Sequence, residues 1–164
     1  MRRRAALITV SGAAFAGCGF QLRQSPALPF RSIALVGFQP TSPLRGVLRS
    51  ELERAGVTLP EQPGQAEAVF DALADAREKT VAASTAAGQV RELQLRVRLR
   101  FRVATPAGKL LLPASDLLLT RDMSYSETAA LAKQQEEALL YRAMDEDIVA
   151  QVLRRLAAIA PWKS

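Results

Sequence analysis

The side chains that could perform acid–base chemistry in this sequence are carboxylates grouped near the C-terminus. Two runs, Glu136-Glu137 and Asp145-Glu146-Asp147, offer the paired carboxylic acids that a glycosidase-type hydrolase uses as general acid and base. Adjacent residues on a helix point in different directions, so these carboxylates do not converge on one substrate. We therefore interpret both runs as a solvated helix face.

The composition excludes several other kinds of catalytic and metal site. The sequence has no histidine, which excludes a Ser-His-Asp triad, an HExxH zinc site and a histidine general base. It has one cysteine, so an intrachain disulfide and a cysteine-rich metal site are excluded too. We predict a protein that is not an enzyme and that uses no metal and no cofactor.

A row of arginines is the strongest candidate for a binding surface. From Leu93 to Val103 the odd positions are apolar, which predicts a β-strand with one face on the core. The even positions then project from the other face, about 7 Å apart, and they include Arg96, Arg98, Arg100 and Arg102. Aligned like charges repel and do not help the fold, so we favour a role in binding phosphates or the acidic and polar groups of a partner.

The alternative is a solvated sheet face on which salt bridges offset the repulsion, each of them worth little. The candidate cross-strand partners are Asp71, Asp75, Asp116 and Asp122. Nucleic acid is not an expected partner, because no aromatic side chain alternates with the arginines on their face of the strand to stack on bases.

The single cysteine ends a segment that has the features of an export signal. Three arginines at positions 2–4 precede an apolar stretch, residues 5–16, that is too short to span a bilayer. The stretch ends in Phe15-Ala16-Gly17-Cys18, which resembles the lipobox of bacterial lipoproteins. We predict a signal peptide over residues 1–17 and lipidation at Cys18. The alternative is an ordinary signal peptide followed by a chance cysteine.

The elements that must position the arginines can be predicted from the pattern of apolar residues. Residues 18–30 are polar and proline-rich, as expected for a lipidated tether, and residues 31–164 form the folded domain. We predict a buried strand at 33–38, a helix that begins at Ser42-Pro43 and ends at Gly56, and strands at 68–84 and 93–103. A strand region at 110–125, interrupted near Pro113, precedes a long helix from Ser126 or Thr128 to Pro161.

This order predicts an α+β fold. We expect a two-layer sandwich, β-α-β-β-β-α, with a four-stranded, mostly antiparallel sheet and two helices on one of its faces. The arginine row would occupy the other face.

Several segments resemble the LptE family of lipopolysaccharide-assembly lipoproteins. Cys18-Gly19-Phe20-Gln21-Leu22-Arg23 is similar to the start of the mature proteins of that family. Residues 119–125 resemble its last strand, and residues 130–137 and 144–156 resemble its final helix. The resemblance covers the whole chain in the order of elements and is most specific in the last third.

The resemblance implies a non-enzymatic lipoprotein of the outer membrane, lipid-anchored on the periplasmic side. Gly19 agrees with that location, since an aspartate after the cysteine commonly retains lipoproteins in the inner membrane. The protein would plug an LptD-type β-barrel, assist its assembly and bind lipopolysaccharide in transit. A lipid-anchored activator of a cell-wall enzyme and, less favoured, a carboxylate-dependent hydrolase remain alternatives.

The tip of the first long hairpin, residues 84–89, has no basic residue. Contact with lipopolysaccharide would therefore use Arg91 or side chains further along the strands. The candidate contacts with lipopolysaccharide or the barrel are Arg91, Arg96, Arg98, Arg100, Arg102 and Arg121.

Overall fold

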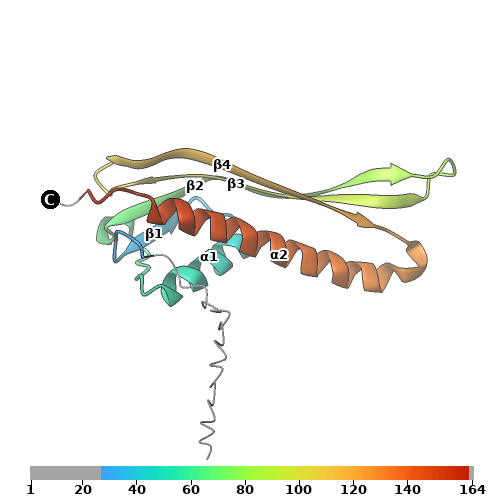
Figure 1. Cartoon of the computed structure of the whole chain (residues 1–164), viewed down its shortest axis with the longest axis horizontal. Helices are drawn as coiled ribbons and strands as arrows, with labels where there is room; N and C mark the ends of the chain where they lie inside the picture. The colour runs from blue at the N-terminus through green and yellow to red at the C-terminus, as the bar shows by residue number, and fades with distance from the viewer. Residues whose placement is uncertain (1–26, 163–164) are drawn as a thin grey trace, which may run out of the picture.

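The computed structural model describes residues 27–162. Its strands are β1 (Ile33–Val36), β2 (Ala68–Ser84), β3 (Val90–Ala104) and β4 (Leu110–Ser124), and its α-helices are α1 (Pro43–Arg54) and α2 (Ala130–Ala157). The strands lie side by side in the order β1-β2-β3-β4, with β1 parallel to β2 and the other pairs antiparallel. Both helices lie on one face of the sheet (Figure 1). The predicted α+β sandwich is confirmed.

Strand β3 shows the predicted alternation over its whole central part. Leu95, Leu99 and Phe101 are fully buried, while the arginines between them are exposed. Because β3 lies between β2 and β4, its buried face forms the middle of the core that the helices cover. The sequence pattern predicts this strand well because one face is apolar at every position and the other polar at every position.

Helix α1 begins as predicted. The Ser42 hydroxyl accepts a hydrogen bond from the Arg45 backbone N–H at 3.1 Å, and Pro43 occupies the first helical turn. Leu44, Leu48 and Leu52 are the buried residues of the helix. Four residues apart, they form one apolar stripe that packs on the sheet.

Gly37 lets the chain leave β1 close to β2. Its φ is +79°, and a Cβ built at this position would lie 2.3 Å from the backbone carbonyl oxygen of Ala72. Strand β1 pairs with β2 only over Ala68–Asp71, so most of β2 has the hairpin partner β3 on one edge and no described strand on the other.

A bulge in β2 changes which of its side chains face the helices. In β2, Ala72 pairs with Phe101 but Ala74 pairs with Arg100, so the pattern of faces shifts at Leu73. Beyond that bulge, three polar side chains lie opposite the buried residues of β3 and therefore face the helices. These are Asp75, Arg77 and Lys79.

The interruption predicted near Pro113 is a bulge in β4 instead of a break. Phe101 pairs with Ser115 and Val103 with Leu112, so an extra residue is accommodated around Pro113 while the strand continues. Proline cannot donate a ladder hydrogen bond, and an edge strand such as β4 tolerates it at a bulge.

Helix α2 begins later than predicted. A 3-10 turn over Glu127–Ala129 precedes it, and neither Ser126 nor Thr128 caps the long helix; their hydroxyls bond to each other at 2.9 Å. The buried residues of α2 begin only at Tyr141. Its first turns, from Ala130 to Leu140, lie beside the long hairpin without a buried side chain (Figure 1).

The predicted signal peptide and Cys18 lie outside the described residues. Phe30, at the end of the predicted tether, is buried, and its ring lies 6.1 Å from that of Trp162. The two ends of the described chain therefore meet on the same side of the core. Within residues 27–162, no helix is long and apolar enough to cross a membrane.

Candidate functional site

The outer face of β3, on the side of the sheet away from the helices, carries the arginine row. We call this surface the arginine face: Arg96, Arg98, Arg100 and Arg102, with the side chains of β2 and β4 that flank them. All four arginines are exposed. The structure therefore brings these four predicted site residues together on one surface.

Carboxylates from both neighbouring strands bind the arginines. Arg98 donates two hydrogen bonds to Asp116 of β4, at 3.1 and 2.5 Å. Arg102 lies 2.8 Å from Asp71 of β2. These two partners were predicted correctly, and they offset the repulsion along the row.

The third arginine is held indirectly. The Arg96 Nε donates to the Gln94 side-chain oxygen at 2.9 Å, and the Gln94 amide donates to Asp122 at 3.0 Å. Asp122 therefore reaches the row only through a glutamine. The fourth predicted carboxylate, Asp75, was assigned wrongly: the bulge at Leu73 turns it to the helix side.

The ion pairs of the arginine face are exposed and therefore exchangeable. The hydrogen bond from Arg98 lowers the pKa of the Asp116 carboxyl and raises the pKa of the guanidinium, yet both side chains are about half exposed. Exposed pairs contribute little to stability, so another anion can replace Asp116 at small loss. Arg100, opposite Asp116, makes no hydrogen bond or ion pair within residues 27–162.

A hollow of about 390 Å³ lies on the arginine face. Its lining consists of Ala76, Glu78, Arg96, Arg98, Asp116 and Leu118. Ala76 is small and leaves room between the two arginines, and Leu118 is 57% exposed beside them. This arrangement contains no nucleophile activated by a base. It can donate hydrogen bonds to an anion and contact a hydrocarbon group at the same time.

The remaining two predicted contacts lie elsewhere. Arg91 is exposed near the start of β3, beside the hairpin turn. Arg121 of β4 pairs with Leu95 of β3 and therefore faces the helices, where its Nη2 lies 3.3 Å from Asp147 of α2. The structure thus separates Arg121 from the arginine face.

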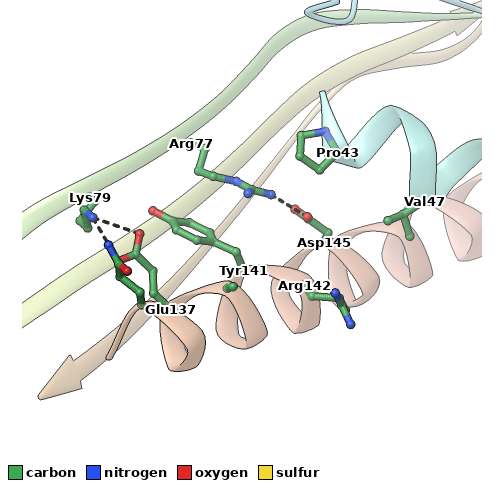
Figure 2. A pocket seen from close by; sticks show the side chains of 10 residues that line it. Pro43, Val47, Arg77, Lys79, Glu137, Tyr141, Arg142 and Asp145 are labelled. Atoms are coloured by element: carbon green, nitrogen blue, oxygen red, sulfur yellow. Dashed lines mark hydrogen bonds and ion pairs between the residues drawn. The ribbon is translucent and has the colours of Figure 1, made fainter. Parts of the chain in front are cut away.

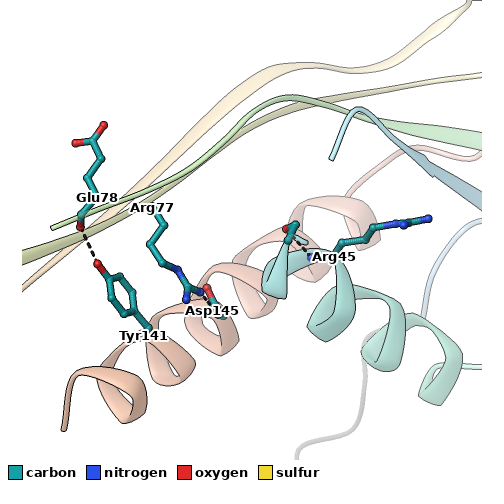
Figure 3. Close-up of polar contacts among 6 residues, drawn as sticks. Arg45, Arg77, Glu78, Tyr141 and Asp145 are labelled. Carbon is teal, nitrogen blue, oxygen red and sulfur yellow. Dashed lines mark hydrogen bonds and ion pairs between the residues drawn. The ribbon is translucent and has the colours of Figure 1, made fainter. Parts of the chain in front are cut away.

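A second polar site lies on the helix side, in a cavity of about 690 Å³ between α1, β2 and α2 (Figure 2). Arg77 donates to the Asp145 carboxylate at 2.6 Å and lies 4.3 Å from the centre of the Tyr141 ring. The Tyr141 hydroxyl donates to the backbone oxygen of Glu78 at 2.8 Å (Figure 3). Lys79 and Glu137 form a further ion pair at 3.0 Å.

This cluster was not predicted from the sequence. Asp145 was expected on a solvated helix face, but the residue is only 3% exposed, whereas Glu146 and Asp147 beside it are exposed as expected. Asp145 follows Tyr141 by four residues and precedes Ile148 by three, so helical spacing places it on the apolar face. This spacing could have predicted that Asp145 is buried.

The carboxylates of α2 do not form a catalytic pair. Each of four is bound to a different cation: Glu136 to Lys133, Glu137 to Lys79, Asp145 to Arg77 and Asp147 to Arg121. No group of three or more acidic, cysteine or histidine side chains within the described residues could hold a metal ion.

A protein-family model matches most of the chain. The model is that of LptE, described as lipopolysaccharide-assembly, and it covers residues 30–156. This range begins at the buried Phe30 and ends within α2, so it includes every strand and both helices. No curated protein sequence matches the chain.

Solved structures of bacterial lipoproteins have a similar fold. The solution structure of an uncharacterized lipoprotein B from Nitrosomonas europaea is 27% identical, with a TM-score of 0.70, covering 85% of this chain and 91% of that one. The rare lipoprotein B from Shewanella oneidensis is 24% identical, with a TM-score of 0.63 and coverages of 77% and 94%. A minor lipoprotein from Acinetobacter baumannii is 21% identical, with a TM-score of 0.64 and coverages of 79% and 92%. The last two likenesses concern the fold alone.

Proposed function

Because this chain belongs to the LptE family of lipopolysaccharide-assembly proteins, we propose that it fills the lumen of an LptD-type outer-membrane barrel and binds lipopolysaccharide in transit. The LptE family is a non-enzymatic component of lipopolysaccharide assembly, and family membership supports a non-enzymatic role for this chain. The observation that best supports the finer proposal is the arginine face, a broad sheet surface that the helices leave uncovered.

The chemistry of the arginine face suits an amphipathic, phosphorylated ligand. Guanidinium groups form paired, charge-assisted hydrogen bonds with phosphate oxygens. Arg98 can exchange Asp116 for such an anion because their pair is exposed, and Arg100 beside it makes no competing bond within the described residues. Leu118 offers an apolar contact next to Arg98. The same donors would also suit polar and acidic groups on a barrel wall.

Capture of the partner tests the proposal. Tagged, full-length protein is purified from its own cells in mild detergent, and the proteins that remain bound are identified. We expect a stoichiometric barrel of LptD type. Recovery of a cell-wall enzyme would favour the activator alternative, and recovery of no partner would contradict the barrel proposal.

Removal of two arginines from the arginine face is expected to weaken lipopolysaccharide binding without unfolding the protein. The double variant Arg98→Ala and Arg100→Ala loses two exposed cations that no core packing requires. A hydrogen bond to a charged group contributes about 1.5–3 kcal/mol, so affinity should fall about tenfold or more. Binding of purified lipopolysaccharide to the full-length variant in detergent measures the effect.

A matched control separates this surface from overall charge. The variant Arg142→Ala and Arg154→Ala removes the same charge from exposed positions on α2, in the opposite layer. It should bind lipopolysaccharide like the unsubstituted protein. Equal loss in both variants would mean that net charge, and not the arginine face, attracts the ligand.

Lipidation at Cys18, which lies outside the described residues, is tested by substitution. Each buried methylene of an acyl chain adds about 0.8 kcal/mol to membrane binding, so several chains make the anchor nearly permanent. In Cys18→Ala cells the protein should keep its first 17 residues or be cleaved elsewhere, and its intact mass should lack acyl chains. An unsubstituted protein whose mass shows no lipid would disprove the anchor.

A further inference from the structure

Asp145 is the buried charged residue of the described chain. Its Oδ2 accepts the hydrogen bond from Arg77 at 2.6 Å. Its Oδ1 is buried as well and has no hydrogen-bond partner. A buried carboxylate oxygen without a donor is strongly unfavourable, so a structure that retains one is expected to satisfy it in another way.

A second carboxylate with the same deficiency lies nearby. Asp75 pairs across the sheet with Leu99, so its side chain faces the helices, and its Oδ2 is buried without a partner. Asp75 lines a small cavity with Arg77 and Pro43, and Asp145 lines the larger neighbouring cavity with the same two residues. Two carboxylates thus adjoin one guanidinium, which leaves one excess negative charge in a largely buried place.

The charged side chains around Asp75 and Asp145 do not neutralise the excess negative charge. On α2, Glu146 adds a further negative charge, and Arg142 lies at the outer side of the cavity. On β2, Lys79 is already paired with Glu137.

The other described elements packed around Asp75, Arg77 and Asp145 contribute no unpaired charged side chain. Helix α1 and the turn before it contribute Thr41, Ser42, Pro43, Leu44 and Val47, and β3 contributes Val97. On the neighbouring β4, Arg121 is paired with Asp147.

A proton satisfies this arrangement better than a metal ion does. The guanidinium of Arg77 would repel a metal cation, and two carboxylates are too few ligands for one. A proton on one carboxyl removes the excess charge and converts an acceptor into a donor. Asp145 is the residue to hold it, because Asp75 lies beside the N-terminus of α1, where the helix dipole favours a negative charge.

We propose that Asp75, Arg77 and Asp145 form a buried proton-binding site that holds α2 against β2 when it is occupied. The proton resides on Asp145 and is donated toward the carboxylate of Asp75. Arg77 bonds the other oxygen of Asp145 in both states. This inference concerns the chain alone and does not depend on the proposed partners.

The environment of Asp145 favours proton uptake. Burial raises the pKa of its carboxyl, whereas the hydrogen bond and charge of Arg77 lower it. The charges of Asp75 and Glu146 raise the pKa further, so the net effect is an increase. A carboxyl whose pKa is raised by folding stabilises the fold at low pH. That contribution is complete below the unfolded value near 4 and is lost as the pH rises through the folded value.

The position of Asp145 along α2 determines which part of the helix loosens when the site loses its proton. From Ala130 to Leu140, α2 has no buried residue, and the ion pair of Lys79 with Glu137 is among the polar contacts that hold it to the hairpin. Tyr141 and Asp145 are where the apolar packing of the helix begins. When the site loses its proton, the first half of α2 should therefore become less firmly seated on β2.

The variant Asp145→Asn tests the site. In the proposed site its amide oxygen accepts from Arg77 and its NH₂ group donates toward Asp75, so it imitates the protonated state at every pH. In the full-length chain in detergent, its Tm should exceed that of the unsubstituted protein by about 3 °C or more at pH 8 and match it near pH 4. Asp147→Asn, an exposed aspartate on the same helix, should not gain this pH-dependent difference.

Direct titration keeps the test decisive even if Asp145→Asn folds poorly. The side-chain carboxyl of Asp145 is followed by carbon NMR in the unsubstituted chain, together with amide hydrogen exchange in residues 130–140. We expect titration above the ordinary aspartate range and faster exchange in that segment above the midpoint. An ordinary or lowered midpoint would overturn the proposal, and so would unchanged exchange.

Discussion

Gly37→Ala is expected to destabilise the domain by about 3 kcal/mol or more, which combines backbone strain with a steric clash. The glycine has a φ of +79°, where an alanine is strained. Its new Cβ would also lie 2.3 Å from the carbonyl oxygen of Ala72. That oxygen belongs to β2 at a residue paired with Phe101 in the core, so it cannot move without disturbing the sheet. Chemical denaturation of the full-length protein measures the loss.

Gly56→Ala provides the matched control. Gly56 has the same φ of +79°, but a Cβ built there meets no atom within 4 Å. Its substitution should therefore show strain alone, about 1 kcal/mol. If the two variants lose the same stability, the close approach of Gly37 to β2 has no energetic weight.

Arg77→Ala is expected to be the most damaging single substitution among the polar residues. It leaves the carboxylate of Asp145 buried without its cation, which typically destabilises a protein by about 3–5 kcal/mol. We expect about 3 kcal/mol at neutral pH, because a third of the Arg77 side chain is exposed and solvent screens part of the charge. Denaturation at several pH values should show a smaller loss in acid, where Asp145 is protonated.

Two further variants test why Arg77→Ala destabilises the protein. Arg102→Ala breaks an exposed pair with Asp71 and should lose about 1 kcal/mol or less. The double variant Arg77→Met and Asp145→Leu removes both members of the ion pair and should recover most of the stability that Arg77→Ala loses. Failure of this rescue would mean that Arg77 acts through its contact with the Tyr141 ring and not through Asp145.

The elements predicted most accurately from the sequence are those whose pattern has a single physical cause. Between Leu93 and Val103, β3 alternates without exception because a middle strand has one face on the core and one in solvent. Helix α1 carries its own cap, so the position at which it begins was predicted. The arginine face follows from these elements and needed no tertiary information.

The misplacement of Asp75 and the omission of Arg77 share one physical source, which is the bulge at Leu73. One extra residue reverses the faces of the following strand, and no composition or spacing marks where that residue falls. Asp75 was therefore placed beside the arginines when it lies under the helices, and Arg77 was not singled out. The partner of Arg77, Asp145, is far away in sequence, so the pair could not be predicted from either segment alone.

The short pairing of β1 has a consequence for how the protein behaves outside its assembly. Past Asp71, one edge of β2 presents backbone donors and acceptors that no described strand uses, and such edges promote strand addition between molecules. Around positions 77–79 alternating charges discourage this, but the run from Thr80 to Ser84 has none. Concentrated protein without a partner should therefore aggregate through this edge first, and a lysine in place of Ala82 should raise its solubility limit.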